Sequence, residues 1–207
     1  MNYISVTTIG YAWAAAHKLV MEAGHIMTDG TKPVTELMNI YISVDDAQAS
    51  DKILDKLADP ARVDWMVNQN FGGTTPIDEW GYSYGMRLRD FHGNDQIAEA
   101  VKKLQIRPGS RSATISLMDP SLDFTGHMPC IVALDPKIRD SKLTLTGFFR
   151  SQDIGKKFYA DMLALAAIQK EIADKVGVTC GSIELLITSA LVCESEYGLQ
   201  ESFRVIA

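Results

Sequence analysis

The C-terminal half of the chain holds an amphipathic helix followed directly by a long apolar stretch, and this pair restricts the possible folds most. From Tyr159 to Val176 apolar residues recur at helical spacing, and Gly177 ends the helix. The next stretch, Thr179 to Cys193, is apolar and β-rich, which predicts a central strand with little exposure. Interleaved helices and strands indicate an α/β (α+β) domain built on one curved sheet.

Upstream, the segment MPCIVALDPKIRDSKLTLTGFFRSQD predicts a hairpin of two antiparallel strands. Its turn is assigned to a polar cluster, Asp135, Pro136, Asp140 and Ser141. Such a hairpin brings Cys130 near the level of Arg150 and Ser151. A thiol near a cation loses its proton more easily, and the thiolate is the nucleophile. Arginine and serine also suit a phosphate, because arginine offers a planar fork of donors.

Each of these residues also has a structural explanation. Free cysteine is among the most buried residue types, so Cys130 alone fits a small buried hydrophobe. Arg150 alone fits a surface ion pair of little energetic weight. The functional interpretation depends on the two occurring together.

Composition limits the class of protein. A chain of 207 residues with 46% apolar and 22% charged residues fits one globular domain, spanning residues 1–207. The net charge of −6 argues against binding a nucleic-acid polymer, which needs a basic face. Three cysteines without CxxC spacing suggest neither a disulfide framework nor a metal site. Neither a signal-type segment nor an apolar run of the ~20 residues needed to cross a bilayer is present, so we expect a cytoplasmic protein without membrane contact.

Other stretches predict the remaining elements. We expect helices over Gly10–Ala23 and Asp95–Leu104, a short helix over Thr35–Ile40, two short surface helices between Asp45 and Asn70, and strands at Tyr41–Val44 and Ser110–Met118.

The order MPC, hairpin, FFRSQD resembles the core of the thymidylate synthase family. The similarity covers Ser110 to Glu194, and more loosely Tyr11 to Arg89. The chain resembles the shorter members of the family, which lack long insertions. It implies the three-layer thymidylate synthase-like fold, with one curved mixed sheet and flanking helices. It also implies a homodimer with isologous contacts.

The resemblance implies a role for each matching residue. Cys130 matches the nucleophile, Arg150 and Ser151 match phosphate ligands, and Asp153 matches the residue that contacts the folate. Glu36 matches a glutamate that orders active-site water, Tyr84 the active-site tyrosine, and Arg111 an arginine that reaches the partner subunit's phosphate. The structural alternatives are a helix-start carboxylate for Glu36 and an aromatic packing on the core for Tyr84.

Asp161 falls where thymidylate synthases have an asparagine that reads the uracil edge. A carboxyl group is better matched to the exocyclic amine of cytosine, and the family's cytidylate hydroxymethylases have aspartate there. The alternative is that Asp161 caps its helix. Four further positions depart from the family's polar residues, Ile131, Phe149, Leu191 and Cys193, and Lys32 is the nearest stand-in for a basic residue of the N-terminal loop.

The sequence therefore predicts a transferase that moves a one-carbon unit from 5,10-methylenetetrahydrofolate, or a related reduced pterin that is not tightly bound, to C5 of a pyrimidine nucleoside monophosphate. The product is a methyl group, as in thymidylate synthesis, or alternatively a hydroxymethyl group, as in a dCMP/CMP hydroxymethylase. A nucleotide-binding relative without turnover is a further alternative. A thiol hydrolase pairing Cys130 with one of the four histidines is the weakest, because no third orienting residue is evident.

Overall fold

The computed structural model describes residues 2–30 and 32–206, whose strands form one mixed sheet. The sheet order is β1-β3-β8-β6-β5-β4, with β2 paired to β3 and β7 paired to β8. The strands are β1 Asn2–Val6, β2 His25–Asp29, β3 Lys32–Val44, β4 Ile115–Ser116, β5 Ile131–Arg139, β6 Lys142–Phe149, β7 Gln152–Asp153 and β8 Thr179–Cys193. The β1–β3, β6–β8 and β7–β8 pairs are parallel, and the other pairs are antiparallel.

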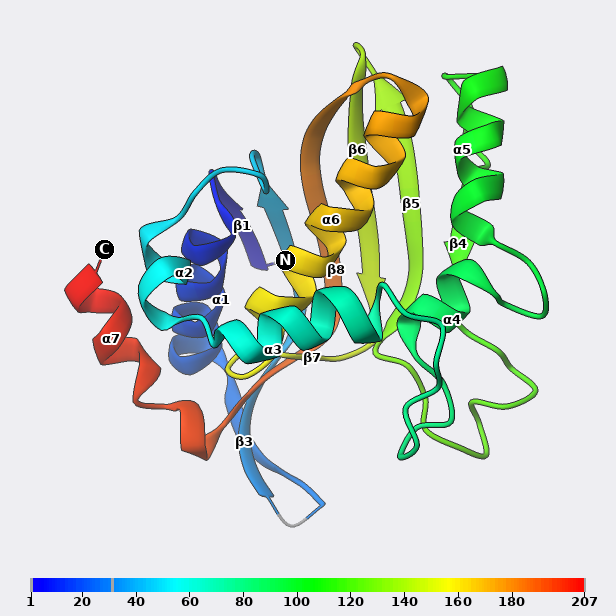
Figure 1. Ribbon diagram of the computed structural model, residues 1–207. Helices are drawn as coiled ribbons and strands as arrows, with labels where there is room; N and C mark the ends of the chain where they lie inside the picture. The colour runs from blue at the N-terminus through cyan, green and yellow to red at the C-terminus, as the bar shows by residue number, and fades with distance from the viewer. Residues whose placement is uncertain (1, 31, 207) are drawn as a thin grey trace.

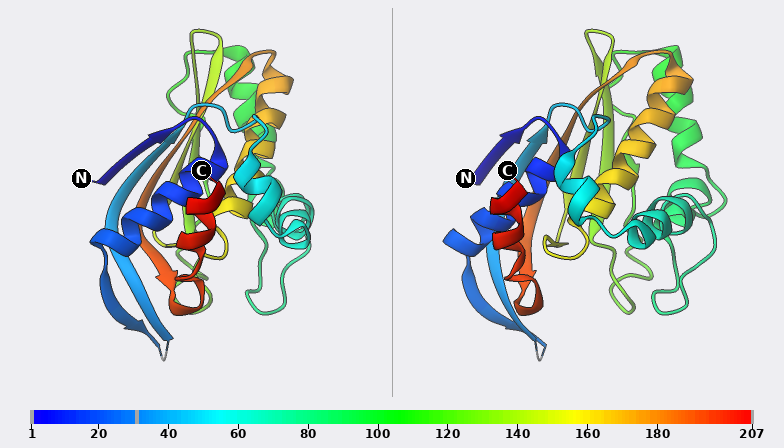
Figure 2. Two further views of the ribbon diagram at one scale, coloured as in Figure 1. Left: turned by 90° about the vertical axis from the view of Figure 1, so that its left-hand side faces the viewer. Right: turned by 60° about the vertical axis from the view of Figure 1, so that its left-hand side comes forward.

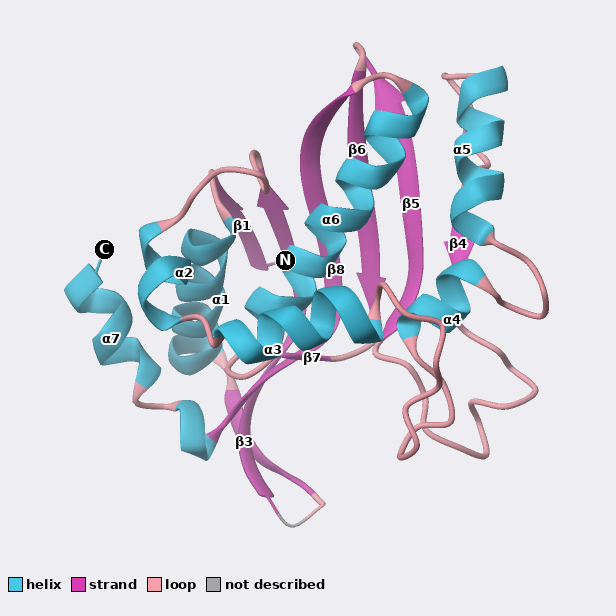
Figure 3. Ribbon diagram, viewed as in Figure 1, coloured by secondary structure: helices cyan, strands magenta, loops and turns pink. Residues whose placement is uncertain are grey.

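The helices lie on one side of this sheet (Figures 1 and 2). They are α1 Ile9–Ala23, α2 Lys52–Leu57, α3 Pro60–Asp64, α4 Tyr84–Arg89, α5 Gln96–Ile106, α6 Phe158–Val176 and α7 Leu199–Ile206, with a π-helical turn at Trp65–Asn70. Helices α1 and α6 pack on the sheet, and α2, α3 and α7 pack outside them. This arrangement confirms the predicted fold class (Figure 3). No helix in the described part of the chain is long and apolar enough to cross a membrane.

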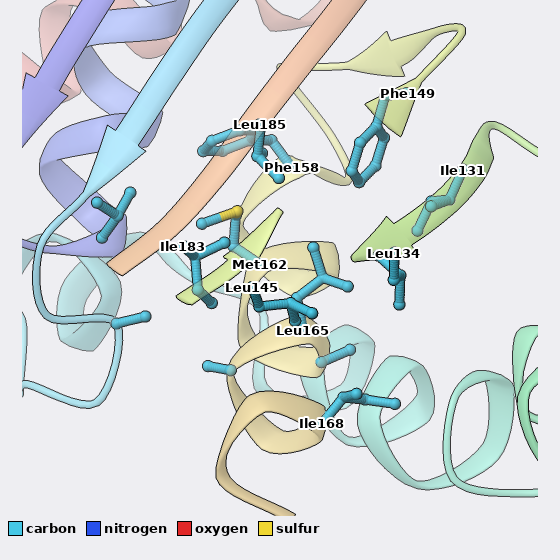
Figure 4. Packing of buried hydrophobic residues seen from close by; sticks show 14 of the residues in the cluster. Ile131, Leu134, Leu145, Phe149, Phe158, Met162, Leu165, Ile168, Ile183 and Leu185 are labelled. Atoms are coloured by element: carbon cyan, nitrogen blue, oxygen red, sulfur yellow. The ribbon is translucent and has the colours of Figure 1, made fainter. Parts of the chain in front are cut away.

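The helix predicted over Tyr159–Val176 and the strand predicted over Thr179–Cys193 are present as α6 and β8. Helix α6 ends at Gly177, whose φ of 81° is in the left-handed region that glycine adopts without a Cβ clash. The helix connects β6 to β8, which pair in parallel and therefore need such a crossover. Met162, Leu165 and Ile168 of α6 point toward the sheet, where they pack among Leu145, Phe149, Ile183 and Leu185 (Figure 4).

The predicted hairpin is confirmed, but its turn is shorter than expected. Only Asp140 and Ser141 form it, with φ of 49° and 59°, the two left-handed residues typical of a type I′ turn. Asp135 and Pro136 instead lie within β5, opposite Thr146 and Leu145. Proline is accepted there because β4 pairs with β5 only at Ala133 and Leu134, which leaves this part of the strand edge open.

The short helix predicted over Thr35–Ile40 is wrong, because this stretch is part of the 13-residue strand β3. Leu37 and Ile40 both point toward the helices, a spacing of three that resembles a helix. The spacing arises from a kink at Asn39, whose φ is 59°, a conformation that asparagine tolerates better than most residues. Strand β8 kinks at the same level, where Ile187 and Ala190 are the successive buried residues.

One further strand is shorter than predicted, whereas two further helices form where they were predicted. The strand expected over Ser110–Met118 pairs only at Ile115–Ser116. The helices expected over Gly10–Ala23 and Asp95–Leu104 are present as α1 and α5, and α5 buries Ile97, Val101 and Leu104.

A buried ion pair fixes α4 to the loop that leads toward Cys130. Arg87 and Asp123 are each 3% exposed, and the guanidinium donates to the carboxylate at 2.6 and 3.0 Å. Arg87 also donates to the Leu117 carbonyl at 2.9 Å, and the carboxylate accepts from the Asp119 backbone N–H. The hydrogen-bonding groups of this cluster all have partners only while both Arg87 and Asp123 are present.

We expect Asp123→Ala to lower the free energy of unfolding by about 3–5 kcal/mol, because it leaves the Arg87 charge buried without a partner. Denaturant unfolding of the variant beside the wild type measures this loss. Glu99→Ala, at an exposed position of α5, is the control and should change stability by less than about 0.5 kcal/mol. A loss below about 1 kcal/mol for Asp123→Ala would contradict the assignment.

Candidate active site

A cavity of about 660 Å³ opens where β8 extends beyond the kink, at the level of β7. It brings together Cys130, Arg150, Ser151 and Asp153, four of the residues singled out in the sequence. The remaining lining residues are Asp29, Lys32, Pro33, Lys156, Lys157, Leu191, Cys193, Glu194 and Ser195. Its volume is typical of small-molecule sites.

The hairpin explains how Cys130 and Arg150 meet. Ile131 pairs with Phe149 at the end of the ladder, and the Arg150 N–H donates to the Cys130 carbonyl at 2.9 Å. The Arg150 side chain reaches back across the pair. Its Nε donates to the Pro129 carbonyl at 2.8 Å, and Nη2 donates to the Met128 carbonyl at 2.6 Å. Part of the guanidinium therefore holds the chain before the cysteine, rather than facing only the cavity.

Tyr84 holds the same chain segment from the other side. Its buried hydroxyl accepts from the Cys130 N–H at 3.0 Å and from the Ile131 N–H at 3.2 Å. The ring packs on Phe71, with centroids 4.7 Å apart. Burial raises the pKa of Tyr84 well above its usual range, so the phenol is neutral at physiological pH. The residue thus packs on the core and also contacts the backbone of Cys130.

Burial raises the pKa of the Cys130 thiol. The positive charges of Lys157 and then Arg150 oppose this effect, whereas Asp161 and Asp153 add to it. The net pKa of the thiol in the free protein is therefore raised, although a lowered pKa was expected beside an arginine. The arginine acts in the expected direction, but loss of solvent outweighs it.

Asp161 is on the first turn of α6, is 6% exposed and is not among the residues that line the cavity. Gln152 Nε2 donates to its Oδ2 at 2.9 Å. Burial raises the pKa of Asp161 to about 6, although the bond from Gln152 and the charge of Lys157 work against that rise. The alternative that Asp161 caps the helix is wrong, because Lys157 occupies the N-cap position.

The histidines do not form a pair with Cys130 in the described residues. His17 Nε2 contacts the Glu196 carbonyl, His92 pairs with Asp119, and His127 contacts the Tyr82 hydroxyl and stacks on Trp80. His25 is exposed on β2. Within residues 2–30 and 32–206, no three His, Cys, Asp or Glu side chains are grouped so that they could hold a metal ion.

Comparison with known proteins agrees with this geometry. The family model for thymidylate synthase matches residues 19–197. A Methanosarcina barkeri protein named "Putative thymidylate synthase" is 32% identical over 203 residues, covering 96% of this chain and 93% of that protein. Proteins of the same name from Methanosarcina mazei and Methanothermobacter thermautotrophicus are 30% and 37% identical, over 96% and 56% of this chain and 93% and 53% of theirs.

The chain belongs to the thymidylate synthase family. The resemblance seen in the sequence is thereby confirmed, and membership supports thymidylate synthase-like transferase chemistry in nucleotide biosynthesis.

Four residues assigned by resemblance to thymidylate synthases are not among those that line the cavity: Glu36, Tyr84, Arg111 and Asp161. Tyr84 and Asp161 are buried. Glu36 is on β3 rather than at a helix start. Its carboxylate accepts a hydrogen bond from the Ser189 hydroxyl of β8. It pairs in register with Leu191, which lines the cavity, so both side chains lie on the same face of the sheet. Arg111 is exposed in the loop after α5.

The departures from the thymidylate synthase pattern fall into two groups. Ile131 and Phe149 are cross-strand partners with at most 1% exposure, and both belong to the hydrophobic core (Figure 4). Leu191 and Cys193 line the cavity. Lys32, the stand-in for a basic residue of the N-terminal loop, also lines it. Sequence reasoning missed Lys156 and Lys157, although two consecutive lysines before a helix were a visible signal.

We expect Asp161→Asn to stabilise the protein in a pH-dependent way. A carboxyl group with a raised folded pKa contributes its full stability below its unfolded pKa, near 4, and loses that contribution as the pH rises through about 6. Asparagine resembles the protonated form at every pH. The gain over wild type should therefore grow between pH 4 and 6 and reach about 3 kcal/mol above pH 7.

Urea unfolding of both proteins from pH 4 to 8 measures this gain. Asp78→Asn, at an exposed position, serves as the control and should show no comparable trend. A gain for Asp161→Asn that does not change with pH would show that the carboxyl group is not buried as described.

Proposed function

We propose that this protein transfers a one-carbon unit from 5,10-methylenetetrahydrofolate, or a related reduced pterin, to C5 of a pyrimidine nucleoside monophosphate through a covalent Cys130 adduct. The observation that carries the proposal is the shared cavity of Cys130, Arg150 and Ser151 in a chain of the thymidylate synthase family. A thiol, an anion-binding pair and a space of about 660 Å³ suit a flat base tethered to a phosphate.

The reaction needs a nucleophile because C5 of a pyrimidine is a poor carbon nucleophile. Attack of the Cys130 sulfur on C6 forms the S–C6 bond, and the electrons of the C5–C6 double bond move toward C5 and the oxygen or nitrogen on C4. C5 can then attack an electrophilic carbon, and later loss of its proton and of the thiolate restores the ring. Tyr84 and Arg150 support this step by fixing the backbone that carries the sulfur.

Phosphate and proton handling are assigned to neighbouring groups. The N–H groups of Arg150 that do not bond to Met128 and Pro129 are available to the phosphate, together with the Ser151 hydroxyl. We assign proton transfer through water to Glu36 and Tyr84. The same-face position of Glu36 beside Leu191 supports this role, as does the contact of Tyr84 with the nucleophile's backbone.

The pterin, when bound, supplies the one-carbon unit and, for a methyl product, the hydride. Asp153 lines the cavity and offers a carboxylate that suits the amino and ring N–H donors of a pterin. Its Oδ1 accepts from the Lys156 backbone N–H at 2.9 Å, which fixes the carboxylate at the cavity wall.

A cytidylate hydroxymethylase is the second candidate, and Asp161 is the observation that favours it. An ionised carboxylate only accepts hydrogen bonds, which matches the exocyclic amine of cytosine better than the carbonyl of uracil. With its pKa near 6, Asp161 is mostly ionised at pH 7.5. In this alternative, water rather than hydride completes the transferred carbon.

Mass spectrometry of the intact protein with 5-fluoro analogues of dUMP, dCMP, UMP and CMP tests the proposal. Each analogue is incubated with and without methylenetetrahydrofolate. The fluorine cannot leave C5 as the proton does, so the covalent complex should accumulate. We expect an adduct on Cys130 with at least one analogue, absent in Cys130→Ser and kept in Cys180→Ser, which alters a thiol outside the cavity.

The analogue that reacts identifies the base and the sugar. If none of the four forms an adduct, the covalent mechanism is wrong, and nucleotide binding without turnover becomes the better account of the cavity.

We further propose that the protein is a homodimer, with Arg111 reaching the partner subunit's phosphate site. The side of the sheet without helices supports this (Figure 2). A row of apolar side chains crosses that side in register, from Tyr3 through Tyr41 and Leu186 to Phe148. Tyr3 is 59% exposed and stacks on Tyr41, and Phe148 is 36% exposed. Such a row suits the core of an isologous interface.

Phe148→Glu should convert the dimer to a monomer, because it places a charge next to Leu186 at the β6 end of this row. Sedimentation velocity measures the change in mass. Phe124→Glu, at an exposed phenylalanine in a loop, is the matched control and should remain dimeric. A Phe148→Glu protein that stays dimeric would exclude this side of the sheet as the interface.

A further inference from the structure

Lys157 is a cation of the cavity that forms no ion pair among the described residues. It occupies the N-cap of α6 and lines the same cavity as Cys130. Its Nζ lies 6.0 Å from the centre of the Trp80 ring, the outer limit of a cation–π contact. Neighbouring Lys156 approaches Glu196 at 3.8 Å, whereas Lys157 has no ion-pair partner within residues 2–30 and 32–206.

Arg150, by contrast, is bound to the backbone. Its Nε and Nη2 donate to the carbonyls of Pro129 and Met128. These two bonds hold the chain that leads into Cys130. A guanidinium in that position cannot turn toward the sulfur without breaking those bonds. The ammonium of Lys157 stands on a flexible four-carbon stem and has no competing bond of this kind.

Several titratable groups respond to Lys157 at once. Its charge is the largest electrostatic influence lowering the pKa of Cys130, and it also lowers the pKa of His127 and opposes the rise at Asp161. The other charged or titratable groups around the sulfur are Arg150, Asp153, Asp161, Tyr82 and Tyr84. These influences agree with the geometry, in which Lys157 starts α6, lines the cavity together with Cys130 and lies near the Trp80 ring.

We propose that Lys157 is the positioning residue that places a positive charge beside the Cys130 sulfur when the thiol is deprotonated. The inference rests on the proposed function for its purpose, because it concerns the nucleophile of that reaction. In this step the S–H bond breaks, its electron pair stays on sulfur, and the proton passes to water in the cavity. No oxidant or reductant is needed.

The test is the pH dependence of Cys130 alkylation by iodoacetamide in the free protein, with the labelled peptide quantified by mass spectrometry. Only the thiolate reacts, so the midpoint of the profile reports the thiol pKa. Lys157→Met should move the midpoint upward and slow labelling at pH 7.5 by roughly 3- to 10-fold. Lys157→Arg, which keeps the charge, should restore most of the rate.

Two controls isolate the effect. Lys156→Met removes the adjacent lysine and should shift the midpoint less than Lys157→Met does. Cys180, which lies outside the cavity, is an internal control whose labelling should be the same in every variant. A change at Cys180 would indicate a general change in structure and would count against the inference.

A Lys157→Met profile that coincides with wild type, or an equal shift from Lys156→Met, would overturn the inference. Its failure is distinguishable from failure of the proposed function, since alkylation needs no nucleotide. A Lys157-dependent thiol without any 5-fluoro adduct would refute the reaction and leave the inference standing. An adduct on a thiol that is indifferent to Lys157 would do the reverse.

Discussion

The structure depends on how the backbone around Cys130 is held. Two N–H groups, of Cys130 and Ile131, donate to one buried tyrosine hydroxyl, and two carbonyls before them accept from one arginine. Buried backbone groups left without partners would each cost about 1–3 kcal/mol, so the loop has one well-satisfied conformation. Tyr84 comes from α4 and Arg150 from the end of β6. The position of the Cys130 sulfur therefore depends on how helix α4 packs against the β5–β6 hairpin, although the two are far apart in the sequence.

Burial gives this arrangement its chemical character. The same packing that fixes Cys130 also removes water from it, and loss of water acts on the thiol more strongly than the nearby arginine does. Burial acts in the same way on the carboxyl group of Asp161 in α6, although the hydrogen bond from Gln152 opposes it. Burial thus raises the pKa of both the thiol and the carboxyl group.

The sequence was a good guide where one local pattern decides the structure. The turn residues Asp140 and Ser141 and the apolar stretches on both sides of them are enough to place Cys130 level with Arg150. Helix α6 and strand β8 follow from periodicity and Gly177. Strand β3 was misread because its kink at Asn39 puts Leu37 and Ile40 three residues apart, a spacing that also describes a helix. The part played by Lys157 and the raised pKa of Cys130 could not be predicted, since both depend on distances between segments and on burial.

The kinks in β3 and β8 decide which side chains of β8 face the helices and which line the cavity. Before the kink, odd-numbered residues of β8 such as Ile183 and Ile187 face the helices. Beyond it, the even-numbered residues Ala190 and Val192 do so instead. Without the kink, regular alternation from Ile187 onward would turn Val192 to the cavity and Cys193 into the core. The kink therefore decides that Leu191 and Cys193, rather than Val192, reach the cavity.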